Sequence, residues 1–325
     1  MAKRSYTLES VAELKSPLPF GPNFLGLSRP AVIGGVGVNV ILPNFTYVDG
    51  KSTPLPHPHL KINWFDYYSK SPFKDLSPWG SITSHNPKKG DILIFIAKRL
   101  TIFSKEKVSE AEAQRLLHAM DDWLKLLNVW VEVIAKVDLN YRGQITQHNT
   151  FDTHVWLDTR NKGGKDIHCR HGASIIAVFP SAVSITPLQW RKILAKTSNG
   201  ERPPESYMFL RDARRMLNIK RYRRAVLDAA TATEMALTKL RDDTLATVTP
   251  ELAAYVQTKS QQISGLVEFH KRNRQPLPDR IQQDIAEPRN KAIHEGKEPS
   301  LDVAKECLLK AEQVVEQVFP RRQLL

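Results

Sequence analysis

This chain of 325 residues divides at the turn-forming stretch Ser198-Asn199-Gly200 and Pro203-Pro204, after which segments with strand character no longer occur. Before this stretch, segments rich in Val and Ile have the character of strands. After it, apolar residues recur three and four positions apart, which is the period of helices. A chain of this length accommodates two domains. The sequence therefore predicts an α+β protein, with a mixed α/β domain over 1–200 and an all-α bundle of about four to five helices over 204–325.

The N-terminal part is expected to combine several strands with one long helix. Strands are predicted at 31–48, 60–68, 91–103, 153–157 and 173–179. Ser109 is suited to cap a helix whose apolar residues recur at alternating spacings of four and three. Such an apolar stripe needs another sheet or helix to pack against. Its residues are Leu116, Met120, Trp123, Leu127, Trp130, Ile134 and Val137. A shorter helix is predicted from Thr186-Pro187 to Lys196.

Two patterns in this part are similar to ligand sites but lack the context that such sites need. The segment Ile33-Gly34-Gly35-Val36-Gly37-Val38 is glycine-rich, like a phosphate-binding loop, yet the residues after it predict a strand where a helix should follow. Five zinc-type side chains match no closed four-ligand spacing: His148, His154, His168, Cys169 and His171. We expect these histidines to lie in loops on a basic surface, and we predict no metal and no cofactor.

The C-terminal part predicts helices over 205–217, 221–240, 250–269 and 301–319. Ser300, after Pro299, is suited to cap the last of them. Cys307 lies near the apolar stripe of this helix and is expected to be a buried packing residue rather than a nucleophile. These helices, joined by short connections, predict a bundle that can bury its own core.

The net charge of +13 favours a polyanionic partner. The densest group of cations has only Asp212 as a counter-charge within its span. We predict that this group of cations contacts nucleic-acid phosphates. Its members are Arg211, Arg214, Arg215, Lys220, Arg221, Arg223 and Arg224. Taken singly, such a cluster is equally compatible with a solvated face.

The stretch from Arg289 to His294, with the sequence Arg-Asn-Lys-Ala-Ile-His, is the strongest candidate for chemistry. It couples a permanent cation to a side chain that exchanges a proton near neutral pH. Because an Arg and a His at this spacing occur by chance in many chains, their context decides their meaning. Asn290 and His294 are four residues apart, so they share one face of a helix, and Arg289 precedes them by one position.

Residues on both sides of this stretch predict where its helix begins and ends. Pro288 fits the first turn of a helix, so the segment 277–287 is expected to stop or kink just before the motif. Gly296 is suited to the left-handed position that ends a helix. His294 then falls in the last turn, where the negative end of the helix dipole favours its protonated form.

The order of a long helix, a second helical region, an Arg-Asn-x-x-x-His motif and a final amphipathic helix resembles the HEPN superfamily of small helical bundles. The resemblance covers about 204–319, including the alanine-rich run Arg221–Leu237 with its polar residue midway. It implies a set of site residues: Arg289 and His294 as the catalytic pair, Asn290 as the polar residue after the Arg, and Glu234 as the polar partner from another helix.

This resemblance also implies a function, namely a metal-independent endoribonuclease acting as a bacterial toxin or anti-phage defence effector. A neutral imidazole would take the proton of a ribose 2′-hydroxyl or protonate the leaving oxygen, and a guanidinium would neutralise the phosphate. DNA lacks this hydroxyl, so the substrate would be RNA and the product a cyclic phosphate. Family ribonucleases pair two motifs across a dimer axis, which implies a homodimer through the C-terminal bundle.

Two other functions remain open at this point. The bundle would form equally well in a non-catalytic HEPN-like module that binds RNA or a protein. In a nucleic-acid-binding regulator, the motif would be accidental and the basic stretch would contact phosphates. In the ribonuclease, the N-terminal domain would sense a trigger ligand or partner, or present RNA.

The expected location is the cytoplasm. The two cysteines, Cys169 and Cys307, are too few and too far apart for a disulfide framework. No apolar run reaches the length of a membrane span, and the N-terminus leads into no signal-peptide core.

Overall fold

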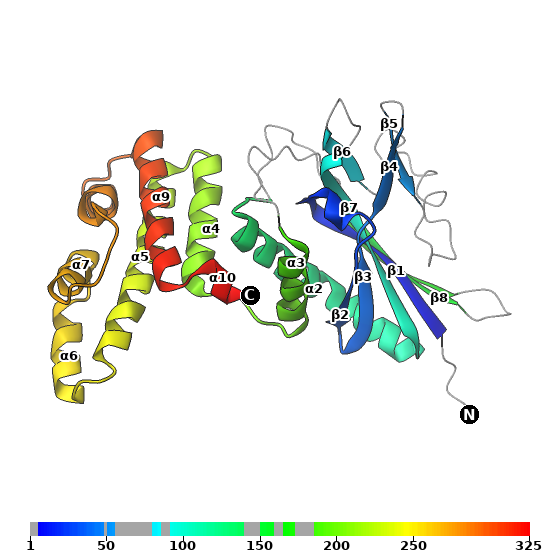
Figure 1. Cartoon of the computed structure of the whole chain (residues 1–325), viewed down its shortest axis with the longest axis horizontal. Coiled ribbons are helices and arrows are strands. Elements are labelled where there is room, and N and C mark those ends of the chain that lie inside the picture. The colour runs from blue at the N-terminus through cyan, green and yellow to red at the C-terminus, as the bar shows by residue number, and fades with distance from the viewer. Residues whose placement is uncertain are drawn as a thin grey trace. The chain divides into compact units, whose positions relative to one another are not determined.

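The computed structural model describes residues 6–48, 51–55, 80–85, 92–139, 150–158, 165–172 and 185–325. Strands and helices are both abundant, and the protein is α+β (Figure 1). The chain divides into two compact units, one of Met1–Ala135 with Arg142–Arg202 and one of Lys136–Tyr141 with Pro203–Leu325. In the part of the chain that is described, every helix is too short or too polar to cross a lipid bilayer.

A seven-stranded antiparallel sheet forms the basis of the N-terminal unit. Its strands follow the order β2-β3-β7-β1-β8-β9, and β6 pairs with β7 beside this path. The strands of this sheet are β1 (Tyr6–Phe20), β2 (Ser28–Ile33), β3 (Val36–Ile41), β6 (Gly80–His85), β7 (Ile92–Val108), β8 (Thr150–Asp158) and β9 (Lys165–Gly172). A separate pair consists of β4 (Asn44–Val48) and β5 (Lys51–Leu55). The strands predicted at 31–48, 91–103 and 153–157 are confirmed, whereas 60–68 and 173–179 lie outside the described residues.

The glycine-rich segment forms the turn between β2 and β3. Gly34 and Gly35 have φ angles of +58° and +77°. Positive φ at both central positions gives a two-residue hairpin turn whose twist matches that of the strands. A Cβ atom on Gly34 would lie 2.7 Å from the carbonyl oxygen of Arg115, so the packing of this turn also requires glycine. As predicted, the segment continues into a strand rather than a helix.

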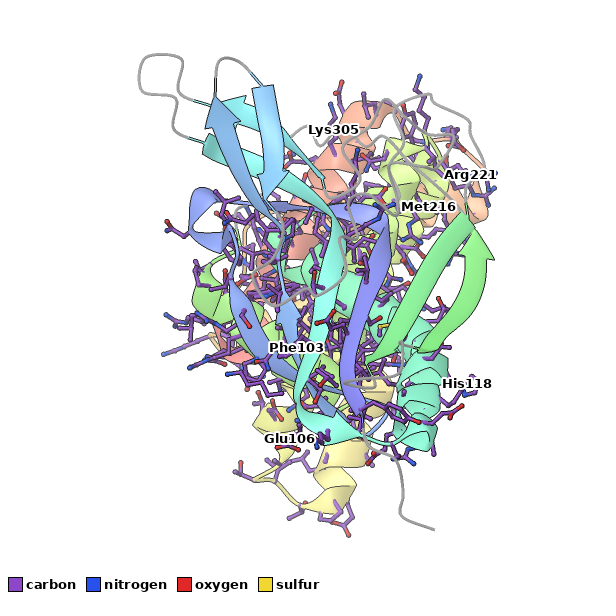
Figure 2. The ribbon with its side chains drawn as sticks, turned by 90° about the vertical axis from the view of Figure 1, so that its right-hand side faces the viewer. Phe103, Glu106, His118, Met216, Arg221 and Lys305 are labelled. Atoms are coloured by element: carbon purple, nitrogen blue, oxygen red, sulfur yellow. The ribbon has the colours of Figure 1, made fainter. Side chains whose placement is uncertain are left out.

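The long helix α2 (Glu110–Ala135) contacts β1, β2, β3 and β8. It begins with a capping box, in which Ser109 Oγ accepts from the backbone N of Glu112 at 3.3 Å and the Glu112 carboxylate accepts from the backbone N of Ser109 at 2.6 Å. The predicted apolar stripe is buried along its whole length, with Val137 just beyond the helix end. His118 lies on the exposed side of the helix (Figure 2).

The helix α3 (Pro187–Ser198) also begins with a capping box, formed by Thr186 and Gln189. Its predicted start at Thr186-Pro187 is confirmed, and its last residue contacts the edge of the sheet. Ser198 Oγ accepts a hydrogen bond of 2.8 Å from the backbone N of Val32 in the edge strand β2. The exposed backbone of this edge is thereby partly satisfied.

The prediction that the zinc-type residues lie in loops was wrong for those that the structure describes. His168, Cys169 and His171 belong to β9, and His154 belongs to β8, where it stands opposite His168 in the register. Pairing with a neighbouring strand supplies backbone hydrogen bonds to a polar segment that has little strand propensity of its own. His148 lies outside the described residues.

The C-terminal unit is helical and centres on the alanine-rich helix α5 (Tyr222–Leu245), which contacts α4, α7, α8 and α9. Small residues such as Ala225, Ala229 and Ala236 are fully buried on α5 and let neighbouring helices approach closely. The other helices are α4 (Glu205–Asn218), α6 (Pro250–Lys259), α7 (Ile263–Arg272), the π-helix η2 (Gln282–Ala286), α8 (Glu287–His294), α9 (Leu301–Val318) and α10 (Arg321–Leu324). The predicted cap of α9 is confirmed, because Ser300 Oγ accepts from the backbone N of Val303.

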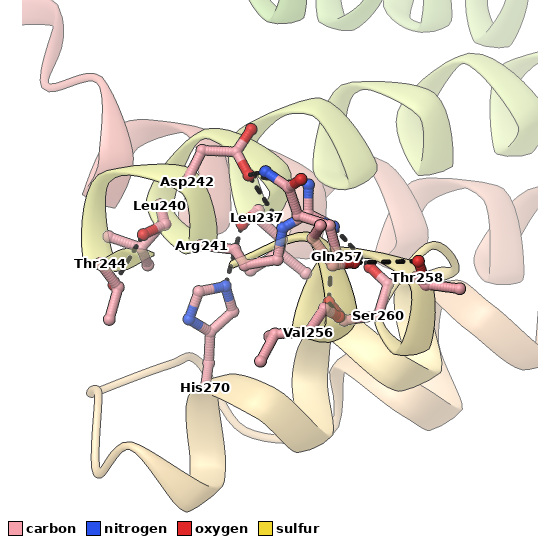
Figure 3. A network of polar contacts seen from close by, with 11 residues as sticks. Leu237, Leu240, Arg241, Asp242, Thr244, Val256, Gln257, Thr258, Ser260 and His270 are labelled. Carbon is pink, nitrogen blue, oxygen red and sulfur yellow. Dashed lines mark hydrogen bonds and ion pairs between the residues drawn. The ribbon is translucent and has the colours of Figure 1, made fainter. Parts of the chain in front are cut away.

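A single helix over 250–269 was a wrong prediction, because the chain breaks between α6 and α7. The buried guanidinium of Arg241 donates to the carbonyl oxygen of Ser260 at 2.8 Å and to Asp242 Oδ1 through Nε at 2.9 Å (Figure 3). His270 Nε2 lies 2.9 Å from the carbonyl oxygen of Leu237. These contacts from α5 hold the chain at the break, where Ser260 is buried although α6 has no buried residue.

Candidate functional site

The motif occupies the helix α8, which continues directly from the π-helix η2. The backbone N of Glu287 donates to the carbonyl oxygen of Gln282, five residues earlier, and Pro288 follows without an N–H. A π-turn changes the hydrogen-bond ladder at the point where proline cannot donate to it. Of the stop or kink expected just before the motif, the stop is not present, because the chain stays helical across Pro288. Helical backbone begins only at Ile281 and then runs on through Pro288.

The predicted end of this helix is confirmed. The last residue of α8 is His294, and the backbone N of Glu295 donates to the carbonyl oxygen of Lys291 at 3.1 Å. Gly296 has a φ of +65°, the left-handed conformation that favours glycine after a helix. His294 consequently lies in the final turn, as the sequence indicated.

Packing on α5 separates the residues of α8 into one buried and several exposed positions. Ala292 is fully buried, and its small side chain lets α8 lie close to α5. Asn290, Ile293 and His294 are exposed. The helix thus presents an imidazole and an amide to solvent, and both are open to a ligand.

Arg289 is held between two oxygen atoms from different helices. Its Nη2 atom lies 3.9 Å from Glu234 Oε2 of α5, and its Nη1 atom donates to Asn290 Oδ1 at 3.3 Å. The side chains of Arg289 and Glu234 are 28% and 30% exposed, so the pair is partly shielded and still reachable. A carboxylate on one side of a guanidinium restricts its orientation and leaves other N–H groups for an anion. The structure thus brings together Arg289, Asn290 and Glu234 of the predicted site, with His294 further along α8.

The direction of α8 against α5 follows from two contacts. Arg289, near the start of α8, meets Glu234 in the middle of α5. Glu298, which follows α8, accepts a hydrogen bond of 3.1 Å from the backbone N of Arg223 at the start of α5. The two segments therefore run antiparallel, and the His294 end of α8 points toward the N-terminal end of α5.

One contact near the motif escaped the sequence reasoning. The buried carboxylate of Asp284 in η2 lies 3.1 Å from Arg280 Nη2 and 3.9 Å from Lys310 Nζ of α9. It anchors the π-turn that leads into the motif helix. No local sequence pattern predicts this role of Asp284, because its partner Lys310 lies on a different helix. An acidic residue among apolar ones is nevertheless a sign that the carboxylate is buried against a cation.

The predicted phosphate-binding cluster splits into parts with different surroundings. Arg211, Arg214 and Arg215, here called the α4 cations, all meet carboxylates. Arg211 pairs with Asp212 at 2.7 Å, Arg214 with Glu312 of α9, and Arg215 Nε lies 3.6 Å from Asp138. The side chains of Arg211 and Arg214 are each only 13% exposed. Asp212 is thus the only carboxylate within this span of the sequence, but the fold brings Glu312 and Asp138 to the same arginines.

The second part of the cluster lies at the turn from α4 to α5. Lys220, Arg221 and Arg223, here called the turn cations, are exposed, and none makes an ion pair with another described residue. Lys220 has a φ of +62°, which reverses the chain after α4. Arg224 shares features with both groups of cations. Its Nη2 atom pairs with the buried carboxylate of Asp228 at 2.9 Å, as the α4 cations pair, but its side chain is 61% exposed.

Two carboxylates of the bundle titrate differently because their surroundings differ. Burial alone would raise the pKa of Glu312, but Arg214, Lys136 and Arg321 outweigh it and lower the pKa below its usual value. Burial raises the pKa of Asp228 above its usual value, although Arg224 opposes this rise. The pKa of the Cys307 thiol is raised to about 12 by burial, so it is a poor nucleophile near neutral pH.

Comparison with protein-family models, with curated proteins and with solved structures finds no match to this chain. Within the described ranges, no group of three or more His, Cys, Asp or Glu side chains is arranged to hold a metal ion.

Proposed function

We propose that the C-terminal unit is a HEPN-type endoribonuclease that cleaves RNA without a metal. The observation that carries the proposal is the pairing of Arg289 with Glu234 across two helices, with an exposed His294 five residues further on, at the end of the motif helix. The residues that pair are those that the resemblance to the HEPN superfamily selects. The fold supports the same proposal, since the motif lies in a bundle of helices around an alanine-rich α5.

The proposed reaction uses the 2′-hydroxyl of the substrate as the nucleophile. The imidazole of one His294 takes the proton of this hydroxyl, whose oxygen then forms a bond to the adjacent phosphorus. The bond from phosphorus to the 5′-oxygen breaks, and that oxygen receives a proton. The products are a 2′,3′-cyclic phosphate and a 5′-hydroxyl. Arg289, oriented by Glu234, binds the non-bridging oxygens as negative charge develops on them.

One His294 cannot serve as both the base and the acid in a single step. A second copy of the chain would supply the other imidazole if two motif helices face one another in a homodimer through the bundle. Ile293, which is 42% exposed beside His294, is an apolar residue that such a dimer would cover. The biological role proposed with this activity is a toxin or anti-phage effector in the cytoplasm, with the N-terminal unit recognising a trigger.

The proposal is tested by incubating the purified protein with mixed RNA in the presence of a chelator. We expect cyclic-phosphate ends, and a loss of roughly a hundredfold or more in cleavage rate for His294→Ala and Arg289→Ala, since proton transfer and charge stabilisation each contribute at least this much. His118→Ala and Lys291→Ala are the matched controls, because they remove an exposed histidine and an exposed cation of the motif helix without touching the site.

Cleavage that survives both His294→Ala and Arg289→Ala would refute the assignment of the site. RNA binding without cleavage, unchanged by any trigger candidate, would favour the non-catalytic module instead. Mixing wild-type chains with an excess of inactive His294→Ala chains tests the shared site, because a mixed dimer holds one imidazole and should lose activity beyond simple dilution only if the two imidazoles of one site come from two chains.

A further inference from the structure

We infer that the turn cations bind the phosphates of single-stranded RNA as the strand extends from the motif along α5. This inference rests on the proposed function for the position of the cleaved bond. It assigns substrate binding to Lys220, Arg221 and Arg223, and it assigns a structural role to the α4 cations.

The antiparallel packing of α8 on α5 places the turn cations on the side toward which His294 points. Arg289 meets Glu234, and Glu298 meets Arg223, so the motif and the turn lie along the same helix. The separation of eleven positions between Arg223 and Glu234 corresponds to about 16 Å at the rise of an α-helix. A stacked strand covers that distance in roughly five nucleotides, at about 3.4 Å per nucleotide. A substrate shorter than this would reach the motif but not the turn.

The charge distribution at this end of the bundle favours a phosphate backbone. The side chains of the turn cations are exposed and form no ion pair with a described residue, whereas Arg214 and Arg215 are already paired. The helices α5 and α9 also run parallel, because Glu298 just before α9 meets Arg223, and Cys307 Sγ lies 4.0 Å from the carbonyl oxygen of Val226. Their positive dipole ends consequently lie at this end, together with the negative ends of α4 and α8, so the exposed cations rather than the helix dipoles set its charge. Arg221 and the exposed Lys305 of α9 both lie at this end of the bundle (Figure 2).

Glu298 occupies part of this surface with a negative charge. Its carboxylate accepts the hydrogen bond from the backbone N of Arg223, an N–H at the start of α5 that an anion of the substrate could otherwise receive. An RNA phosphate that approaches the turn therefore competes with Glu298. Replacing this carboxylate by an amide removes the repulsion and should strengthen binding of the strand.

A single strand fits this arrangement better than a duplex does. The proposed attack by a 2′-hydroxyl requires that its oxygen align with the leaving 5′-oxygen, which the regular backbone of a duplex does not permit. Sequence-tolerant binding of single strands also relies on cations that follow one backbone. The motif and the turn cations supply two anchoring points along one helix edge.

Binding is measured on the catalytically silenced His294→Ala chain, so that the result does not depend on cleavage. Fluorescent oligouridine of twelve nucleotides and of three nucleotides is titrated at several salt concentrations. In this background, Lys220→Ala, Arg221→Ala and Arg223→Ala are combined into one variant. The matched control combines Lys271→Ala, Arg272→Ala and Arg274→Ala, which removes the same charge from exposed residues at the end of α7, near the other half of α5.

We expect the turn variant to bind the longer oligonucleotide roughly tenfold more weakly than the control, with a salt slope lower by about two, since each lost phosphate contact lowers it by about 0.7. Binding of the trinucleotide should be the same in both variants. Glu298→Gln should bind the longer oligonucleotide more tightly than the unmodified background. Thermal unfolding is measured for each variant to confirm that it folds. If the triple variant does not fold, the double variant Lys220→Ala with Arg221→Ala replaces it, because both residues lie outside α5.

Equal binding of the longer oligonucleotide by the turn variant and the control would overturn the inference. An equal loss for the trinucleotide would do so as well, because it would show a general effect of charge. If the wild type cleaves no RNA while the length-dependent contrast holds, the proposed function fails and the binding surface stands. Tighter binding of a duplex than of the single strand would instead assign the turn to double-stranded nucleic acid.

Discussion

The α4 cations and the turn cations are neighbours in the sequence but differ in what surrounds them. Arg211 and Arg214 are largely buried and paired, and Arg215 contacts Asp138 from a distant part of the chain. Lys220, Arg221 and Arg223 are exposed to solvent a few residues later. Because a paired and buried guanidinium has few N–H groups left for a ligand, residue type alone does not define a phosphate-binding surface. The same arginine-rich stretch therefore stabilises the bundle at one end and is open to a polyanion at the other.

The largest effect on this comparison is expected from Arg214→Ala. The side chain of Glu312 is only 15% exposed. Without the guanidinium of Arg214, the one ion-pair partner left to it among the described residues is Lys136, at 3.4 Å. Breaking a buried pair costs about 3 kcal/mol of the free energy of unfolding. Urea denaturation measures the loss, and Arg223→Ala should change the stability by less than about 0.5 kcal/mol. If Arg214→Ala instead keeps full stability and loses RNA binding, the two groups of cations have been assigned the wrong way round.

The second-largest effect is the pH dependence of the stability that Glu312 contributes, which should be smaller than the loss expected for Arg214→Ala. The pKa of Glu312 is lowered in the fold, because Arg214, Lys136 and Arg321 outweigh the effect of burial. A lowered carboxyl pKa contributes stability above the pKa of the unfolded chain, and this contribution is lost as the pH falls through the folded value. The difference in unfolding free energy between wild type and Glu312→Gln should thus be largest near neutral pH and shrink in acid. A difference that grows in acid would contradict this view of the α4 cations.

The smallest effect is expected from Asp228→Asn, which tests the intermediate case of Arg224. Burial raises the pKa of Asp228, so its contribution to stability is present at low pH and is lost as the pH rises through the folded pKa. Replacing this buried carboxylate by an amide of similar shape should change the stability by less than about 1 kcal/mol at neutral pH. The amide also releases Arg224, whose side chain is 61% exposed, to bind a phosphate. The salt slope for oligouridine should then rise by up to about 0.7, and an unchanged slope would place Arg224 outside the RNA path.

Much of the fold follows from local patterns. Ser109, Thr186 and Ser300 each precede an apolar stripe, and all three accept the backbone hydrogen bond of a helix start. A cap depends on residues within one turn, so a short stretch of sequence contains the information that it needs. The break at Ser260 could not be predicted in this way, because it is held by Arg241 from a different helix.

The candidate site shows the same division. The helix of the motif and its end at Gly296 follow from the order of residues, since glycine adopts the left-handed conformation without strain. The resemblance to the HEPN superfamily selected Glu234, but only the packing of α8 on α5 brings its carboxylate to Arg289. The π-turn before Pro288 and its anchor at Asp284 were not foreseen, because Lys310 lies on another helix.

By itself, the sequence determined the α+β class, most helix starts, the position of the motif in a last helical turn and the strong positive charge. These features depend on composition or on neighbours a few residues apart. The tertiary structure alone decided which cations are neutralised and which are free. Arg214 and Glu312 are 98 residues apart and meet only when α4 packs on α9. Ion pairing depends on distance in space, and a linear pattern does not encode that distance.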